Sequence, residues 1–333
     1  MINKEHPQVE FGKTGILLVN LGTPDSTNWF DVRRYLKEFL SDRRVIEVNP
    51  IIWQIILNLF ILTLRPSKSA RAYKKIWFKE TNESPLLFYT RSQAEKLNKN
   101  IGNGNVIVDF AMRYGNPSIK SKLNLLKEKG CENIIILPLY PQYAAATTAT
   151  VCDEVYRTLM KIRWQPSLQI IPHYESDTKY IGALINSIQR KIKNISWKPD
   201  LIIASYHGIP KSYFDKGDPY QCYCHKTTRL IKERFIDIEI KTTFQSRFGP
   251  RKWLKPYTDK TLEGLPEQGI KNVLVICPGF ASDCVETLEE INIEGKDIFL
   301  KNGGKNFELI PCLNDDIDHI ELFEKLIKKY LVN

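Results

Sequence analysis

Three short motifs occur twice in this chain, in the same order, and this repeat constrains the fold more than any other feature. The pairs are residues 110–116 (FAMRYGN) with 244–250 (FQSRFGP), 133–138 (NIIILP) with 272–278 (NVLVICP), and 170–172 (IIP) with 309–311 (LIP). Corresponding residues lie 134 positions apart in the first pair and 139 apart in the other two. This near-constant spacing predicts two similar halves that face each other.

Buried strands alternate with amphipathic helices along both halves. Continuous apolar runs that end in Gly or Pro are typical of strands covered on both faces, and the helices between them predict parallel βαβ units. The strands are expected at residues 14–21, 106–112, 133–139, 169–172, 201–205 and 272–277. The sequence therefore predicts an α/β protein with a first half over residues 1–175 and a second over 176–333, whose C-terminal helix is free to pack back on the first half.

An insertion of about fifty residues distinguishes the first half. Pro24 and Arg113 are 89 residues apart, whereas Pro210 and Arg247 are only 37 apart, so the extra chain lies at about residues 45–90. Residues 51–64 within it are apolar almost all round. They predict either a buried core helix or an exposed lip at a cleft mouth or membrane surface, with Ile52, Trp53, Ile56 and Phe60 as lip residues. Basic residues flank this segment, as contact with anionic headgroups would require.

Charge and cysteine content narrow the partners and the compartment. The net charge of +10 favours acidic partners, but no Lys/Arg run is dense enough to predict nucleic-acid binding. Seven cysteines, an odd number, favour a reducing compartment. Residues 1–7 lack the apolar core of a secretory signal, and no apolar run reaches the ~20 residues of a spanning helix. We therefore expect a cytoplasmic protein that is not integral to a membrane, with contact to the inner membrane face through the lip.

His207 follows the buried strand at residues 201–205 and precedes Gly208. Ligands of open α/β sheets bind outside the carboxyl ends of the strands, so His207 is placed where a ligand is expected. Histidine exchanges protons near neutral pH and is a common metal ligand. A structural histidine whose hydrogen bonds are satisfied within the core is the alternative.

A stripe of carboxylates follows another strand end of the second half. Glu286, Glu290 and Glu294 are spaced four residues apart on an expected helix, and Asp283 lies one turn earlier. The stripe predicts a relay for protons or a divalent cation, with a solvated acidic face as the alternative. Spacing by four also suits a π-type widening of the helix.

Together, His207 and Glu286 predict a pair that shares a proton or a divalent metal at the edge facing the first half. The first half offers apolar and cationic groups there, which suit a large flat ligand bearing carboxylates. The candidate binding residues are Leu21, Arg113, Tyr114 and Tyr140.

The ordered motifs resemble those of the ferrochelatase family, which inserts Fe(II) into protoporphyrin IX. They are residues 18–24 (LVNLGTP), 113–115 (RYG), 139–143 (LYPQY), 205–210 (SYHGIP) with 217–220 (GDPY), and 282–291 (SDCVETLEEI). The resemblance extends from about residue 15 to about residue 330. It implies two Rossmann-like halves around a porphyrin cleft, formation of protohaem with release of two protons, and the last step of haem biosynthesis.

The resemblance also implies roles for individual residues. His207 and Glu286 match the pair that handles metal and protons, and the histidine is either the proton acceptor or the group that delivers iron. Glu290 and Glu294 match the family's acidic helix, while Arg113 and Tyr114 match porphyrin-contacting positions. Residues 51–64 match a hydrophobic lip that also contacts membrane. Iron is a substrate, and no resident cofactor is required.

Departures from the family pattern concern the cysteines. Some relatives carry a 2Fe–2S cluster on cysteines that include several beyond the last helix, and such a cluster is not expected here, because Asn333 ends the chain and Ala145 replaces one of those cysteines. Cys222 and Cys224, with His225, form a compact group in what we expect to be a loop, and a differently wired cluster there is the alternative. Cys284 stands where relatives often carry histidine.

Other functions remain as alternatives. They are a chelatase for coproporphyrin or another metal, and a porphyrin or metal carrier without turnover. A carrier needs no proton path, so the carboxylate stripe argues against it. A nucleotide-binding oxidoreductase is disfavoured because no G-x-G-x-x-G follows a strand. The sequence gives no indication of oligomeric state.

Overall fold

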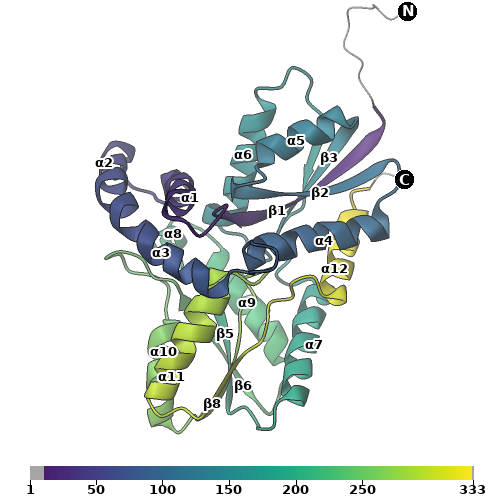
Figure 1. Cartoon of the computed structure of the whole chain (residues 1–333). Coiled ribbons are helices and arrows are strands. Elements are labelled where there is room, and N and C mark those ends of the chain that lie inside the picture. Colours follow the sequence, from purple (N-terminus) through teal and green to yellow (C-terminus); the bar gives the residue numbers. More distant parts are fainter. Residues whose placement is uncertain (1–10, 332–333) are drawn as a thin grey trace, which may run out of the picture.

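Two parallel sheets with the same strand order form the framework of the protein (Figure 1). The computed structural model describes residues 11–331. The first sheet has the order β2-β1-β3-β4, and the second has the order β6-β5-β7-β8. This arrangement confirms the predicted α/β fold of two similar halves. The strands are β1 (Lys13–Thr23), β2 (Val106–Gly115), β3 (Cys131–Pro138), β4 (Ser167–Ile170), β5 (Leu201–His207), β6 (Glu239–Gln245), β7 (Asn272–Ile276) and β8 (Asn306–Leu309).

The strands that lie second in each sheet order, β1 and β5, are buried on both faces. Ile16 to Val19 of β1 and Ile202 to Ala204 of β5 are fully buried. In register, β1 pairs with β2 and β3, and β5 pairs with β6 and β7. Complete burial explains why these strands are continuous apolar runs without alternation.

Helices cover the sheets on both faces and join the two halves. Their bounds are α1 (Trp29–Ser41), α2 (Pro50–Ile56), α3 (Leu62–Ile76), α4 (Pro85–Ile101), α5 (Ile119–Glu128), α6 (Thr150–Leu159), α7 (Thr178–Asn194), α8 (Lys211–Asp215), α9 (Tyr220–Lys232), α10 (Thr258–Gly264), α11 (Lys296–Lys301) and α12 (Ile317–Lys328). Three π-helical segments, η1 (Leu57–Ile61), η2 (Ala145–Ala149) and η4 (Glu286–Gly295), and the 3-10 turn η3 (Pro266–Gln268) complete the described elements.

One apolar core runs through both halves. It contains Ile16 and Leu18 of β1 together with Ile202 and Ala204 of β5. The C-terminal helix α12 packs against α4 of the first half and against α7. The two sheets lie on either side of residue 175, but because the halves share a core, an exact boundary between them stays a prediction.

The insertion of the first half forms a projecting helical arm (Figure 1). The connection between β1 and β2 contains α1, α2, η1, α3 and α4, whereas that between β5 and β6 contains only α8 and α9. The arm exposes large apolar side chains, so the alternative of a buried core helix is wrong. Their exposed fractions are Ile51 74%, Ile52 56%, Ile55 54%, Ile56 36%, Leu59 64%, Phe60 58% and Leu64 74%.

The inner face of the arm packs against α1 of the first half. Leu57 and Leu62 are buried against α1, and the indole N–H of Trp53 donates to the carbonyl of Leu40 at 2.6 Å. Within the described residues, the helical segment Pro50–Ile76 has the length and apolar composition of a membrane span, and its 18-residue apolar window has a mean hydropathy of 1.3. The sequence-based expectation overlooked this because it counted only the uninterrupted apolar run. The N-terminal residues on which the absence of a signal was judged lie outside the described part.

Candidate active site

His207 is the last residue of β5, and its imidazole has one nitrogen left for chemistry. Nδ1 lies 2.7 Å from the carbonyl oxygen of Gly208. A carbonyl oxygen can only accept a hydrogen bond, so Nδ1 carries the proton and the lone pair of the neutral ring is on Nε2. This contact fixes the tautomer and the ring orientation, as expected for a base or a metal ligand.

Gly208 allows the backbone to turn close to the neighbouring strand. Its N–H donates to the carbonyl of Gln245 at 2.8 Å, and a Cβ at position 208 would lie 2.9 Å from that oxygen and 3.3 Å from the Trp253 ring. Any larger residue would therefore displace the chain that carries His207.

Gln245, at the end of β6, links the strand ends to the π-helix. It is the register partner of His207, and its side-chain amide donates to the carbonyl of Glu286 at 2.8 Å and to Glu290 at 3.4 Å. Its side-chain oxygen accepts from the hydroxyl of Ser205 at 2.7 Å. The imidazole strand and the carboxylate helix are thus held at one edge of the second sheet.

The carboxylate stripe lies on a π-helix, as its spacing suggested. Glu286 and Glu290 are half-buried and Glu294 is exposed, so the stripe leads from the interior to the surface. Burial raises the pKa of Glu290, opposed by hydrogen bonds from the hydroxyl and N–H of Ser246 and by the nearby His207. Glu286 also acts on the pKa of Glu290, so Glu290 lies close to both His207 and Glu286. The direct pairing of His207 with Glu286 stays a prediction.

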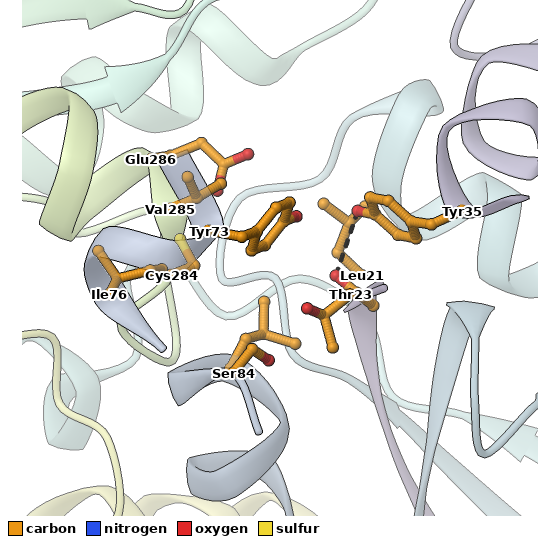
Figure 2. A pocket seen from close by; sticks show the side chains of 11 residues that line it. Leu21, Thr23, Tyr35, Tyr73, Ile76, Ser84, Cys284, Val285 and Glu286 are labelled. Atoms are coloured by element: carbon orange, nitrogen blue, oxygen red, sulfur yellow. Dashed lines mark hydrogen bonds between the residues drawn. The ribbon is translucent and has the colours of Figure 1, made fainter. Parts of the chain in front are cut away.

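A small pocket against Glu286 lies between the halves (Figure 2). Tyr35 of α1 and Tyr73 of α3 point toward each other across it, and the Tyr35 hydroxyl donates to the carbonyl of Gly22 at 3.2 Å. Burial raises the pKa of both phenols well above the usual range. The cavity volume is about 10 Å³, which is room for about one water. The full lining is Leu21, Gly22, Thr23, Tyr35, Tyr73, Ile76, Ser84, Leu86, Cys284, Val285 and Glu286.

Two predicted binding residues are buried in a structural cluster instead. Tyr114 is fully buried, and the side chain of Arg113 is only 6% exposed. The Arg113 guanidinium pairs with Asp42 at 2.5 Å and donates to the carbonyl of Thr150 at 2.7 Å, while the Tyr114 hydroxyl donates to Asp42 at 2.9 Å. These contacts hold the end of α1 against β2. In this structure neither side chain is presented to a substrate, contrary to the sequence-based expectation.

Leu21 and Tyr140 have different surroundings. Leu21 lines the pocket beside Glu286. Tyr140 is buried, and its hydroxyl has no hydrogen-bond partner. Their predicted contact with a substrate stays a prediction.

Asp283 is occupied by structural hydrogen bonds rather than open to a path. It is 4% exposed, and its carboxylate accepts from the Thr287 hydroxyl, the Cys312 N–H and the Asn314 amide. The expectation that it belongs to a proton or metal path is therefore replaced by a role in holding the start of the π-helix.

The cysteine group at residues 222–224 does not form a joint ligand set. The expected loop is helix α9, on which Cys222 is exposed and Cys224 is buried. Residues two apart on a helix do not face each other, so the two sulfurs point in different directions. Among the described residues, no three His, Cys, Asp or Glu side chains are arranged to hold a metal ion.

Sequence reasoning missed Gln245, Tyr35 and Tyr73. Gln245 could have been found from the repeat, because it stands where the first half has Ala111, a polar residue in place of an apolar one at a buried strand end. The two tyrosines belong to helices that the repeat does not contain, so only the folded structure brings them to Glu286.

Comparison with known proteins identifies the family. The family model described as Ferrochelatase matches residues 13–331. The chain belongs to the ferrochelatase family. A ferrochelatase of Allorhizobium ampelinum is 54% identical over 330 residues, covering 98% of this chain and 96% of the relative, and one of Francisella tularensis subsp. novicida is 53% identical over 324 residues, covering 96% of each.

Solved structures agree with the fold. SirB from Bacillus subtilis, solved with Fe3+, has a TM-score of 0.57 at 12% identity, covering 95% of both chains. DR2241 from Deinococcus radiodurans is a multi-domain protein with structural similarity to chelatases. Its TM-score is 0.54 at 10% identity, and the match covers 97% of this ferrochelatase-family chain and 56% of DR2241. At these identities the likeness shows the two-half α/β fold alone.

Proposed function

We propose that this member of the ferrochelatase family inserts Fe2+ into protoporphyrin IX, giving protohaem and two protons. The observation that carries the proposal is the meeting of three groups at one sheet edge: the free Nε2 of His207, the Glu286 carboxylate in the pocket between the halves, and the partly buried Glu290 behind it. Insertion must remove two pyrrole protons and strip water from a cation, and these groups can do both.

His207 acts at the macrocycle through Nε2, either by accepting a pyrrole proton or by holding the iron on its way in. Its Nδ1–H bond to Gly208 keeps the lone pair on Nε2 in the neutral ring. Glu286 supplies the second group of the pair, as a proton acceptor or as an oxygen ligand to the incoming cation.

The carboxylates of the π-helix carry protons or metal between the pocket and solvent. Burial raises the pKa of Glu290 above its ordinary value, so this carboxyl holds a proton more readily than an exposed glutamate and can pass it along the helix. Exposed Glu294 completes the route at the surface.

Substrate access requires the halves to separate near the arm. A cavity of about 10 Å³ beside Glu286 is far smaller than a tetrapyrrole. The contacts that join the arm to the second half must rearrange, among them Lys75 with Glu289 at 2.6 Å and Arg65 over the Phe248 ring at 4.1 Å. Arg65 is half-buried and has no acidic partner among the described residues, so its guanidinium is available for a porphyrin carboxylate.

The arm places the enzyme against the inner face of the membrane, in the cytoplasm. Its exposed apolar side chains form the surface defined by Ile51, Ile52, Ile55, Ile56, Leu59, Phe60 and Leu64, here called the lip surface. Exposed Arg43, Lys68, Arg71 and Lys74 flank it and suit anionic headgroups. An apolar porphyrin could then pass between the bilayer and the pocket without crossing water.

The reaction needs no resident cofactor, with iron as the substrate. The different directions of Cys222 and Cys224 on α9 support this, since they cannot bind one cluster together. Acid-labile sulfide measured on protein purified without air tests it: a stoichiometric amount would contradict the proposal.

The decisive experiment follows protoporphyrin IX absorbance with the purified protein and Fe2+ under reducing, anaerobic conditions. Conversion to the haem spectrum is expected, and an unchanged porphyrin spectrum would remove the enzymatic function. Parallel reactions with coproporphyrin III and with Zn2+ compare substrates. A higher kcat/KM for coproporphyrin would overturn the choice of protoporphyrin while leaving chelatase activity intact.

A further inference from the structure

Asn314, in the loop after β8, makes four hydrogen bonds beside the start of the π-helix. Its side-chain oxygen accepts from the Asp283 N–H at 2.8 Å, and its side-chain amide donates to the Asp283 carboxylate at 2.7 Å. Its backbone carbonyl accepts from Gln93 and from Nδ1 of His319, each at 2.7 Å. The Asn314 side chain therefore binds both the backbone N–H and the carboxylate of Asp283.

Asp283 passes this restraint to the turn that bears Glu286. The second carboxylate oxygen of Asp283 accepts from the Thr287 hydroxyl at 2.9 Å, and that hydroxyl accepts from the Cys284 N–H at 3.0 Å. Cys284 and Thr287 enclose Glu286 in the sequence, and Thr287 is fully buried. The backbone on both sides of Glu286 is thus fixed through Asp283.

Gln93 ties the same loop to the first half. This fully buried residue of α4 donates to the Asn314 carbonyl and also to the carbonyl of Ala281 at 3.2 Å and the hydroxyl of Ser282 at 3.1 Å. The position of the loop before the π-helix therefore depends on contact between the halves.

The backbone at Asn314 narrows the residue types that could serve there. Its φ is +46°, in the left-handed region that Gly and Asn adopt most readily. Glycine would fit the backbone but offers no amide to Asp283. Asparagine meets both requirements at once.

We propose that Asn314 is a positioning residue for Glu286, acting through Asp283, with Gln93 coupling that position to the first half. The proposal rests on the role of Glu286 proposed above. A structural role alone would give loss of stability without a specific effect on turnover.

Among the described residues, the titratable groups that face Asp283 are neutral. Facing it are Tyr89 of α4, Cys277 after β7, and Cys284 and Cys312, all with pKa values that burial raises. His319, beyond Asn314, is kept neutral because burial lowers its pKa to about 4. Of the described groups next to Asn314, Asp315 is anionic and pairs with Lys96 at 2.6 Å. A second carboxylate placed at position 314 would therefore meet Asp283 without a compensating cation.

Asn314→Gly removes the side chain and keeps the left-handed backbone. We expect kcat for iron insertion to fall roughly 10- to 100-fold, as for loss of a group that orients a ligating residue, with KM for protoporphyrin changed less than about threefold. The matched control is Asn82→Gly, at another left-handed Asn whose side chain accepts from Trp77 at an exposed turn, and its kcat should stay at the wild-type value.

Asn314→Asp gives a readout that a merely structural role would not move. At high pH two carboxylates face each other, whereas at lower pH a shared proton restores one hydrogen bond between them. The ratio of variant to wild-type kcat should therefore rise as pH falls. Urea unfolding of each variant at each pH checks that the protein remains folded.

The following outcomes separate the possibilities. Wild-type kcat and an unchanged pH profile in both Asn314 variants would overturn the proposal, as would equal losses of kcat, porphyrin affinity and stability without pH-dependent recovery. Glu286→Gln, measured in parallel, tests the assumption beneath it. If Glu286→Gln is inactive while the Asn314 variants are normal, only the positioning role fails; if Glu286→Gln is fully active, the proposed role of Glu286 fails.

Discussion

The side-chain amide of Gln245 donates a 2.8 Å hydrogen bond to the backbone carbonyl of Glu286. Since the backbone of Gln245 is the register partner of His207, one buried residue links the two predicted catalytic groups. A π-helix has a different backbone hydrogen-bond pattern from an α-helix, so some of its carbonyls need other donors. The Gln245 amide is the donor to one of them. The distance between imidazole and carboxylate is thereby set by β5, β6 and η4 together.

Gln245→Leu should lower kcat about tenfold or more, because it leaves the Glu286 carbonyl and the Ser205 hydroxyl without this partner and frees the π-helix. Steady-state kinetics of iron insertion measure it. Gln169→Leu, on β4, is the control, since the side-chain oxygen of Gln169 is buried without a partner and its removal should leave kcat unchanged. Equal kcat for the two variants would show that Gln245 does not position Glu286.

His207→Ala and Glu286→Ala should each lower turnover at least ~100-fold, as for loss of a general base or a metal ligand. Porphyrin binding, followed by fluorescence quenching, should change little, because the role proposed for both groups is in the transfer of protons and metal. His225→Ala removes an exposed histidine of α9 and serves as the control. Near wild-type turnover in both test variants would place the chemistry elsewhere.

The sequence predicted the fold and the position of His207 because both depend on local patterns. Buried strands are apolar runs, and a residue after such a run lies at the carboxyl edge of the sheet whatever the rest of the chain does. The four-residue spacing of Glu286, Glu290 and Glu294 also suited a π-type helix, and the structure confirms that type.

The sequence could not predict which polar residues face a substrate and which are satisfied internally. Arg113 and Tyr114 lie near the end of a strand, as His207 does, yet Asp42 at the end of α1 pairs with the Arg113 guanidinium and accepts a hydrogen bond from the Tyr114 hydroxyl. Asp283 belongs to the acidic motif but is held by Asn314, which is 31 residues away. Such pairings join segments that are far apart in the sequence. No local pattern or repeat in the sequence indicates them, so they cannot be predicted from it.

Arg65→Ala should raise KM for protoporphyrin about tenfold with a smaller effect on kcat, because a charge-assisted contact to a substrate carboxylate is lost. Burial lowers the pKa of Arg65, but a guanidinium stays charged at neutral pH. Arg71→Ala, an exposed position on the same helix, is the control. A porphyrin dimethyl ester, which lacks the carboxylates, should bind wild type and Arg65→Ala alike; a loss of ester binding equal to that of the free acid would point to Arg65 acting through Phe248 instead.

Glu290→Gln should change how stability depends on pH. Because burial raises the pKa of Glu290 above its ordinary 4.5, the folded protein keeps this proton at pH values where the unfolded chain has lost it. The resulting stabilisation is fully present below pH 4.5 and is lost as pH rises through the folded pKa. The free energy of unfolding is measured in urea for Glu290→Gln and for wild type. The value for Glu290→Gln minus that for wild type should increase as pH rises from 4.5 and become constant above the folded pKa. Exposed Glu128→Gln should show no such trend, and a constant difference for Glu290→Gln would contradict the raised pKa.

Replacing Ile55, Leu59 and Phe60 together by serine should abolish most binding to vesicles that contain anionic lipid. These side chains are 54–64% exposed on the lip surface, so their removal costs the folded protein little, whereas each contributes apolar area to a bilayer contact.

Binding is measured by co-sedimentation with phosphatidylcholine vesicles with and without phosphatidylserine, at low and high salt. Wild type should bind best with phosphatidylserine at low salt, because the flanking cations are then least screened. The control is Ile236→Ser with Ile317→Ser, at exposed isoleucines outside the arm, which should bind as wild type does. If the lip variant binds vesicles as well as the control variant does, the lip surface does not bind membrane. A role in porphyrin access alone would then raise the KM of the lip variant for protoporphyrin above that of wild type, both in detergent and from vesicles.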